Sequence, residues 1–184
     1  TDKEKHVLIN DLKHAIERNE LHLFYQPKIA LKTGKGAGCE SLIRCQHSER
    51  GTIFPEIFIP LAEETGLIVP IGNWIIKQAC EDMVNLHNQG YKDLVVAINL
   101  SSYQFERSDV AAFIAQTIEQ TKIEPKKLEI ELTESLIMQN PAKSLLMLKV
   151  LKSMGISLAM DDFGTGYSSL SKLIEFPIDT LKVD

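Results

Sequence analysis

The sequence predicts an α/β domain whose sheet is mostly parallel. Three observations support this fold class: strand-like runs alternate with helical stretches in the second half, a hairpin precedes them, and 184 residues suffice for one sizeable core. Alternation at this spacing is typical of parallel βαβ units. A closed (β/α)₈ barrel needs about 250 residues. The sequence therefore predicts a barrel that stops before it closes, or an open sheet of about six strands.

The first half of the chain is predicted to hold a hairpin between helices. The turn at Lys32–Gly36 is rich in Gly, separates two strand-like runs and favours a β-hairpin. Gly90 ends the longest helical pattern, in keeping with the role of Gly at helix ends. In chain order the predicted elements are a helix at 7–16, strands at 22–31 and 37–46, a short helical region between Pro55 and Pro60, and a helix from Pro70 to Gly90.

The second half alternates strands and helices. Its strands are short, as in LVVAINL and KLEIELT, and Gly155 begins the turn into a third such run. This alternation places the carboxyl ends of the strands at one edge of the sheet. The predicted strands are residues 94–100, 127–133, 157–162 and 180–184, and the predicted helices are 110–121, 142–154 and 168–175.

Composition and charge argue against several classes of protein. Hydrophobic residues make up 44% and charged residues 24%, which is ordinary for a globular domain, and no apolar run approaches the ~18 residues that span a bilayer. A net charge of −5 argues against binding to a DNA or RNA polymer, although divalent cations would let an acidic protein bind a phosphodiester. The three cysteines lack disulfide or zinc spacing, so we expect reduced thiols and a cytoplasmic location, alone or as the cytoplasmic part of a membrane-anchored protein.

Polar residues stand at the ends of the predicted strands, where buried strands should be apolar. Side chains that recur once per βα unit converge at the carboxyl end of a parallel sheet, where active sites form. Side-chain alternation agrees with this, because Glu40, Leu42 and Arg44 share one face of their strand. The polar set is Glu40, Asn99, Glu131, Asp161, Asp162 and Lys182.

Such a cluster needs compensating positive charge, because each buried, unpaired carboxylate costs several kcal/mol. One Lys and one Arg cannot balance four or five carboxylates. Oxygen ligands from Glu, Asp and Asn suit Mg²⁺ or Mn²⁺, and the lack of His in the set argues against zinc. One carboxylate bridging two such ions is the usual arrangement for phosphodiester hydrolysis. The alternative is a set of exposed loop acids, which the regular spacing of these positions disfavours.

Seven segments resemble EAL-family domains, and together they cover essentially the whole chain. Glu40-Ser41-Leu42 stands where this family carries its namesake Glu-Ala-Leu. The order of the segments makes the resemblance specific. They are FYQP (24–27), ESLIRCQH (40–47), FIPLAEETGLIVPIGNWII (58–76), INLSSYQF (98–105), LEIELTES (128–135), DDFGTGYSSL (161–170) and FPIDTLKVD (176–184).

The resemblance implies a TIM-like barrel whose first strand is antiparallel, and hydrolysis of cyclic di-GMP to linear pGpG with two Mg²⁺ or Mn²⁺ ions. Lys182 would orient or polarise the attacking water, and Glu134 would hold the DDFGTG loop. Gln26, Leu42 and Arg44 would contact the substrate, Arg44 through a phosphate oxygen that suits its guanidinium fork. The implied metal ligands are Glu40, which also counts as catalytic, Asn99, Glu131, Asp161 and, for the second ion, Asp162.

Two departures from the family pattern bear on function. Ser41 replaces Ala, a small change on the strand face opposite Glu40. The family continues past the LKVD strand with two further βα units that bring another Glu and a Gln. We therefore expect residues 1–184 to be one EAL-type domain fragment of a longer signalling protein, with sensor or GGDEF domains upstream.

This chain alone is expected to be weakly active or inactive, because its catalytic set would be incomplete. Its open strand edges would favour a homodimer or higher oligomer. A non-catalytic cyclic di-GMP-binding module and a dimerising regulatory module remain the alternative functions.

Overall fold

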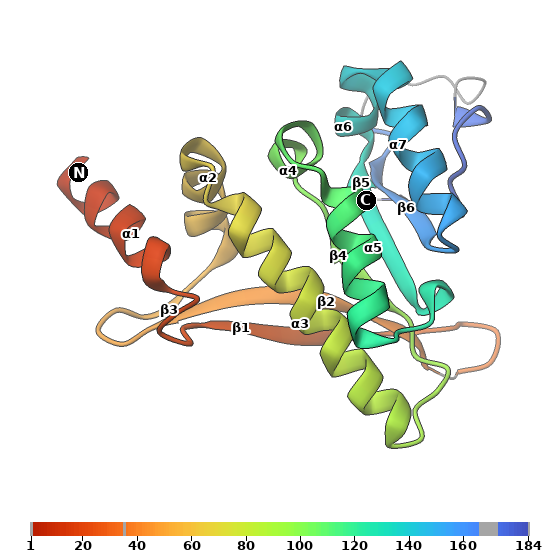
Figure 1. Ribbon diagram of the computed structural model, residues 1–184, viewed down its shortest axis with the longest axis horizontal. Coiled ribbons are helices and arrows are strands. Elements are labelled where there is room, and N and C mark those ends of the chain that lie inside the picture. Colours follow the sequence, from red (N-terminus) through yellow and green to blue (C-terminus); the bar gives the residue numbers. More distant parts are fainter. Residues whose placement is uncertain (1, 35, 166–172, 184) are drawn as a thin grey trace.

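A computed structural model describes residues 2–34, 36–165 and 173–183 of the chain (Figure 1). Its seven-stranded sheet begins with the predicted hairpin, in which β1 (Leu21–Ile29) runs antiparallel to β2 (Gly36–His47) and Gln26 lies opposite Glu40. From β2 onward, neighbouring strands on the main path pair in parallel. These strands are β4 (Val96–Asn99), β5 (Leu128–Thr133), β6 (Ser157–Phe163) and β7 (Thr180–Val183). The α/β class and the antiparallel first strand are confirmed.

The main core lies between the parallel strands and the helices that connect them. Apolar side chains such as Ile98 on β4 and Ile130 on β5 are at most 1% exposed and pack with helical residues such as Ile114 and Leu148. At about 25 cal/mol per Å² of buried apolar surface, this layer is the main source of stability. The helices that form it are α3 (Ile68–Asn88), α5 (Val110–Thr121) and α7 (Pro141–Ser153).

A second core fills the space under the hairpin. Helix α1 (Asp2–His14) contributes Leu12, α2 (Pro55–Thr65) contributes Phe58, and β2 contributes Ile43. Figure 1 shows α1 and α2 above the hairpin, at the end of the molecule away from β5 and β6. On the main path of the sheet, β1 and β7 are the two end strands, so the described strands form an open, curved sheet.

The structure corrects one sequence prediction about a local element and adds three short elements that the sequence analysis missed. Helix α2 continues through Pro60 to Thr65, because Pro55 occupies its first turn and Gly66 ends it at φ 77°. The sequence analysis missed β3 (Gly51–Ile53), α4 (Ser102–Arg107) and α6 (Glu134–Gln139), which are too short for periodicity to reveal. Most of the helix predicted at 168–175 lies outside the described residues.

Three buried thiols lie in these cores. Cys39, Cys45 and Cys80 are unpaired, as the sequence predicted. Burial, assisted by nearby acidic side chains, raises the pKa of Cys45 to about 11 and that of Cys80 to about 12. In the described part of the chain, no helix combines the length and the apolar character needed to cross a bilayer.

Candidate active site

Strand β2 separates its side chains onto two faces. Ser41 and Ile43 point into the core, whereas Glu40, Leu42 and Arg44 are partly exposed on the other face. The Ser41 hydroxyl donates to the backbone oxygen of Ala97 at 3.0 Å, so this buried Ser is satisfied by the neighbouring strand β4. The parity predicted from the sequence is therefore present, and it aims Glu40 at the inner face of the curved sheet.

Glu40 meets the end of β4 through Asn99. The Asn99 side-chain amide donates to Glu40 Oε1 at 3.0 Å. In the parallel ladder Asn99 lies opposite Glu131 and Glu40 lies opposite Ala97, so the polar residues of β2, β4 and β5 share one face of the sheet and are offset by two residues at most. The structure thus brings together three of the side chains that the sequence predicted as metal ligands.

Glu131 is the most buried member of the group, with its side chain fully shielded from solvent. Its two oxygens have different partners. Oε1 lies 3.0 Å from Lys28 Nζ on β1, and Oε2 lies 2.9 Å from Lys182 Nζ on β7. Charge-assisted hydrogen bonds of this length compensate a carboxylate that would otherwise be costly to bury.

Lys182 is the centre of the cluster. Its ammonium nitrogen lies 3.6 Å from Glu40 Oε2 and 3.7 Å from Asp161 Oδ1, in addition to its bond with Glu131. Burial alone would lower the pKa of Lys182, but the hydrogen bond to Glu131 and the charges of the three carboxylates outweigh it and raise that pKa. Lys182 is therefore a permanent cation at neutral pH, suited to orienting or polarising a ligand rather than to accepting a proton.

The two adjacent aspartates lie where β6 loses its regular register. Between Met160 and Phe163 the pairing with β7 shifts, and Asp162 adopts left-handed backbone at φ 54°. Its N–H donates to Asp161 Oδ1 at 2.9 Å. This bend frees Asp161 and Asp162 from the strict alternation of a strand, which would point them to opposite faces. Asp161 is half-buried beside Lys182, and Asp162 is exposed.

Glu134 lies behind this bend. It is 1% exposed at the start of α6, and its Oε2 accepts the backbone N–H of Gly164 at 2.9 Å. The bond ties the segment that follows Asp161 and Asp162 to the helix after β5. This is the contact that a residue holding the DDFGTG loop would make; residues 166–170 of the DDFGTGYSSL segment lie outside the described part of the chain.

The donor chemistry of the cluster fits a divalent cation. Among the described residues, Glu40, Glu129, Glu131 and Asp161 contact two ammonium groups, those of Lys28 and Lys182, and this set carries a formal charge of −2. The donors are carboxylate and amide oxygens, which suit Mg²⁺ or Mn²⁺. Within the described residues, no three His, Cys, Asp or Glu side chains are grouped as around an ion. Lysine nitrogens lie between the carboxylates instead.

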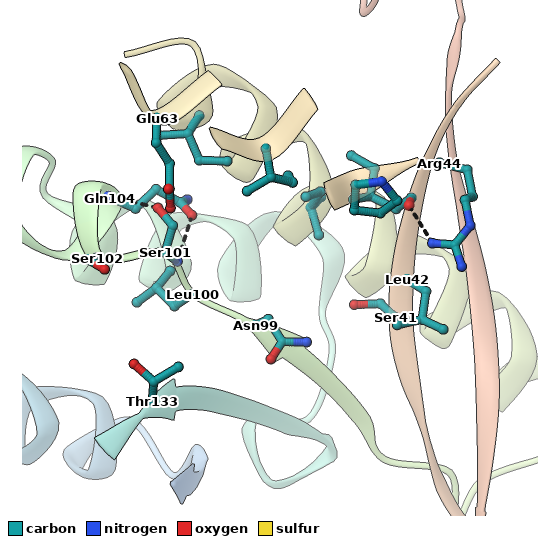
Figure 2. Close-up of a pocket in the computed structure, with 15 residues that line it drawn as sticks. Ser41, Leu42, Arg44, Glu63, Asn99, Leu100, Ser101, Ser102, Gln104 and Thr133 are labelled. Atoms are coloured by element: carbon teal, nitrogen blue, oxygen red, sulfur yellow. Dashed lines mark hydrogen bonds between the residues drawn. The ribbon is translucent and has the colours of Figure 1, made fainter. Parts of the chain in front are cut away.

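A cavity of about 350 Å³ adjoins the cluster (Figure 2). Leu42 and Arg44 from β2, Asn99 from β4 and Thr133 from β5 line one side of it, and apolar residues of α2 and α3 line the other. The Arg44 guanidinium donates to the backbone oxygen of Ile43 at 2.8 Å and lies 5.9 Å from the centre of the Phe54 ring. Most of its donors remain available to an anion.

The cavity wall includes a tight contact between helices α3 and α4. Gln104 completes a capping box with Ser101 at the start of α4 and is 2% exposed. Its amide lies directly on Gly72 of α3, where a Cβ would overlap it. The site therefore depends on a Gly that the sequence analysis did not single out.

Of the predicted substrate contacts, Leu42 and Arg44 line the cavity, whereas Gln26 is exposed on β1 opposite Glu40. The sequence analysis missed Lys28, which shares a strand face with Gln26, and the contact it makes with Glu129 at 3.5 Å. Applying side-chain parity to β1, as was done for β2, would have found Lys28.

Known proteins resemble this chain in sequence and in fold. The MucR protein of Pseudomonas aeruginosa, a bifunctional diguanylate cyclase and cyclic di-GMP phosphodiesterase, is 41% identical over 182 residues, which are 99% of this chain and 27% of that protein. The cyclic di-GMP phosphodiesterase NbdA of the same organism is 38% identical over 95% of this chain and 22% of that protein. A solved structure of the MucR phosphodiesterase in complex with cyclic di-GMP has a TM-score of 0.93 at 42% identity, covering 96% of this chain and 72% of that one.

The chain thus spans about a quarter of the length of these curated relatives, 27% and 22% respectively. The family model described as EAL domain matches residues 9–184. The solved MucR structure shares the fold at 42% sequence identity. The strand-end carboxylates, the antiparallel first strand and these matches lead to one conclusion: the chain belongs to the EAL domain family.

Proposed function

We propose that this domain hydrolyses cyclic di-GMP to linear pGpG with the help of bound Mg²⁺ or Mn²⁺. The observation that carries the proposal is the meeting of Glu40, Asn99, Glu131 and Asp161 on one face of the sheet, beside a cavity that Arg44 lines. EAL phosphodiesterases are generally dependent on divalent metals, and two relatives are named as cyclic di-GMP phosphodiesterases.

Within this function the side chains divide into those that hold the cations, one that acts on water or phosphate, and one that keeps the bend of β6 in place. Glu40, Asn99, Glu131 and Asp161, together with Asp162 at the bend of β6, would hold the cations. When bound, these ions would activate water and neutralise the phosphodiester. Lys182, as a permanent cation, would orient the attacking water or share the charge of the phosphoryl oxygens. Glu134 would keep the bend in place through its bond to Gly164.

The cavity supplies the binding part of the proposal. Arg44 can offer a planar pair of donors to a phosphate oxygen, and Gln26 projects from the same face of the hairpin as Glu40. Leu42 and the apolar wall of α2 and α3 suit the face of a nucleobase. The combination of an apolar wall, a guanidinium and an acidic metal-binding set matches a nucleotide with an internal phosphodiester.

The wider setting of the domain is also a proposal. The relatives it matches are several times longer than this chain, which supports sensor or GGDEF domains in the same polypeptide. We place the domain in the cytoplasm, and we propose that it forms a homodimer or higher oligomer. Because β1 and β7 are end strands of an open sheet, the rate of this chain alone should fall below the ~1 s⁻¹ typical of enzymes.

Glu40→Gln tests the proposal. The purified chain is incubated with cyclic di-GMP and Mn²⁺, and pGpG formation is followed by chromatography over hours so that a slow rate is measurable. Loss of a charged group in contact with the reacting centre should lower the rate at least ~100-fold. Glu119→Gln, the same change on the exposed surface of α5, is the matched control and should retain the rate.

Two results would contradict the proposal. An unchanged rate in Glu40→Gln would remove Glu40 from the site. Tight binding of cyclic di-GMP with no pGpG at any Mg²⁺ or Mn²⁺ concentration, both in this chain and in a longer polypeptide that contains it, would identify a binding module instead of an enzyme.

A further inference from the structure

Lys28 is a cation inside the acidic site that comes from the antiparallel strand. It stands near the end of β1, opposite Gly38 of β2, and its side chain is about one-third exposed at 34%. Its ammonium nitrogen lies 3.0 Å from Glu131 Oε1 and 3.5 Å from Glu129 Oε1. The Lys28 side chain thus reaches from β1 across the sheet to β5, where both glutamates stand.

The two carboxylate oxygens of Glu131 have different lysine partners: Lys28 contacts Oε1 and Lys182 contacts Oε2. Lys28 binds Oε1 from below the level of the predicted ligands, where Glu129 precedes Glu131 by two residues on the same face of β5. Oε2 is left facing Lys182, and with it Glu40 and Asp161. Glu131 is thereby fixed with a single oxygen directed at the centre of the acidic set.

We propose that Lys28 is a positioning residue of this site: it fixes Glu131 so that one oxygen serves the cation, and its charge limits how tightly that cation binds. This role rests on the proposed cation site. Lys28 and a divalent ion would act on the same carboxylate, one through each oxygen. The two positive charges would repel each other, so each would weaken the binding of the other to Glu131.

The charge balance gives the sign of the effect. With Lys28 present, the four carboxylates carry a formal charge of −2, and without it they carry −3. A site that is more negative attracts a divalent cation more strongly. Loss of one nearby unit charge, screened by solvent, should tighten Mn²⁺ binding by about tenfold. Freeing Glu131 Oε1 from its bond should lower the rate at the same time, because the carboxylate can then turn.

The experiment measures Mn²⁺ binding by calorimetry and unfolding by thermal melts, in the purified chain. Lys28→Met keeps the length of the side chain and removes its charge. Lys32→Met makes the same change on the exposed turn that follows β1 and is the matched control. Lys28→Arg keeps the charge and tests rescue. If Lys28→Met does not fold, the same measurements are made on Lys28→Gln, which also removes the charge.

The expected pattern has three parts. In Lys28→Met, Mn²⁺ binds about tenfold tighter than in the wild type, the melting midpoint without Mn²⁺ falls, and the rise in midpoint caused by Mn²⁺ grows. Lys28→Arg stays within about twofold of the wild-type affinity. Lys32→Met matches the wild type in every measurement.

Unchanged or weaker Mn²⁺ binding in Lys28→Met overturns the role of Lys28, as does equal tightening in Lys32→Met. A wild-type chain that binds no Mn²⁺ overturns it as well. Failure of the proposed function looks different: Mn²⁺ would bind and respond to Lys28→Met as expected, while no pGpG formed from cyclic di-GMP.

Discussion

Alternate residues of strand β5 follow two different physical rules. Ile130 and Leu132 are at most 1% exposed and pack into the core between the sheet and its helices. Glu129 and Glu131 alternate with them in sequence and contact Lys28 on the other face. The face with Ile130 and Leu132 is stabilised by apolar packing, which tolerates little loss of side-chain volume. The face with Glu129 and Glu131 depends on the balance of charges, which one bound ion can change. Stability and chemistry are therefore separable by mutation within one strand.

The largest expected effect is on the apolar face. Ile130→Ala should lower the free energy of unfolding by about 2–5 kcal/mol, because it leaves a cavity in a fully buried position. Glu40→Gln, on the charged face, should melt near the wild-type temperature, since it reduces an excess of negative charge. Chemical denaturation of both variants checks this. A Glu40→Gln variant as unstable as Ile130→Ala would show that the two faces are not separable.

Arg44→Ala should weaken nucleotide binding by about 10- to 100-fold, the scale of lost hydrogen bonds to a charged group. Its guanidinium lines the cavity and contacts no carboxylate of the cluster in the described contacts, so Mn²⁺ affinity should stay near that of the wild type. Arg44→Lys keeps the charge without the planar fork and should lose less. Calorimetry with cyclic di-GMP and with Mn²⁺ measures both; equal losses of the two ligands in Arg44→Ala would refute the division of roles.

Gly72→Ala should lower the free energy of unfolding by about 1–2 kcal/mol, despite the better helix propensity of Ala, because the added Cβ overlaps the buried Gln104 amide. Combining it with Gln104→Ala removes the overlap. The double variant should therefore lose less stability than the two single losses added together. If urea denaturation shows that the losses in free energy of unfolding are additive, the Gln104 side chain can move aside and does not clash with the added Cβ.

The smallest expected effect concerns the start of β7, which carries Lys182. Asp179 accepts hydrogen bonds from Lys152 at 2.6 Å and from the Leu158 N–H at 2.8 Å. Burial acts to raise the pKa of Asp179, but these bonds and the Lys152 charge outweigh it, so that pKa lies below its ordinary 3.8. The ionised form therefore stabilises the fold above about pH 4, and this contribution is lost as the pH falls through the lowered pKa.

Asp179→Asn should consequently be less stable than the wild type by up to about 1 kcal/mol at pH 7, the scale of a partly exposed ion pair. The difference should shrink steadily as the pH falls below 3.8. Urea denaturation of both proteins at several pH values checks this. A difference that grew on acidification would reverse the sign assigned to Asp179.

Strand alternation accounts for what the sequence could predict. Period-two patterns placed Glu40 and Arg44 on one face, and the βα spacing placed Asn99 and Glu131 at the same level. These are local rules that need no knowledge of tertiary structure. Their oxygen donors also suggested metal binding, whereas the separate catalytic and substrate-binding roles came from resemblance to a family.

What the sequence analysis missed depends on short elements and on contacts across the sheet. Helices α4 and α6 have six residues each and are set by their caps, Ser101 and Thr133, more than by periodicity. The Ser101–Gln104 spacing was a readable signal for α4. Lys28 contacts Glu131 across 103 positions of sequence, and only the curvature of the sheet brings β1 and β5 within reach.

The three buried thiols have a practical consequence for spectroscopy. A thiol reacts with maleimides as its thiolate, and a pKa of about 11 for Cys45 or about 12 for Cys80 leaves roughly 100- to 1000-fold less thiolate at neutral pH than in an ordinary cysteine. Leu31, at the start of the hairpin turn, is 98% exposed. A fluorophore or spin label can therefore be attached at Leu31→Cys while the native cysteines are kept, which gives a reporter in the turn directly after the strand that carries Lys28.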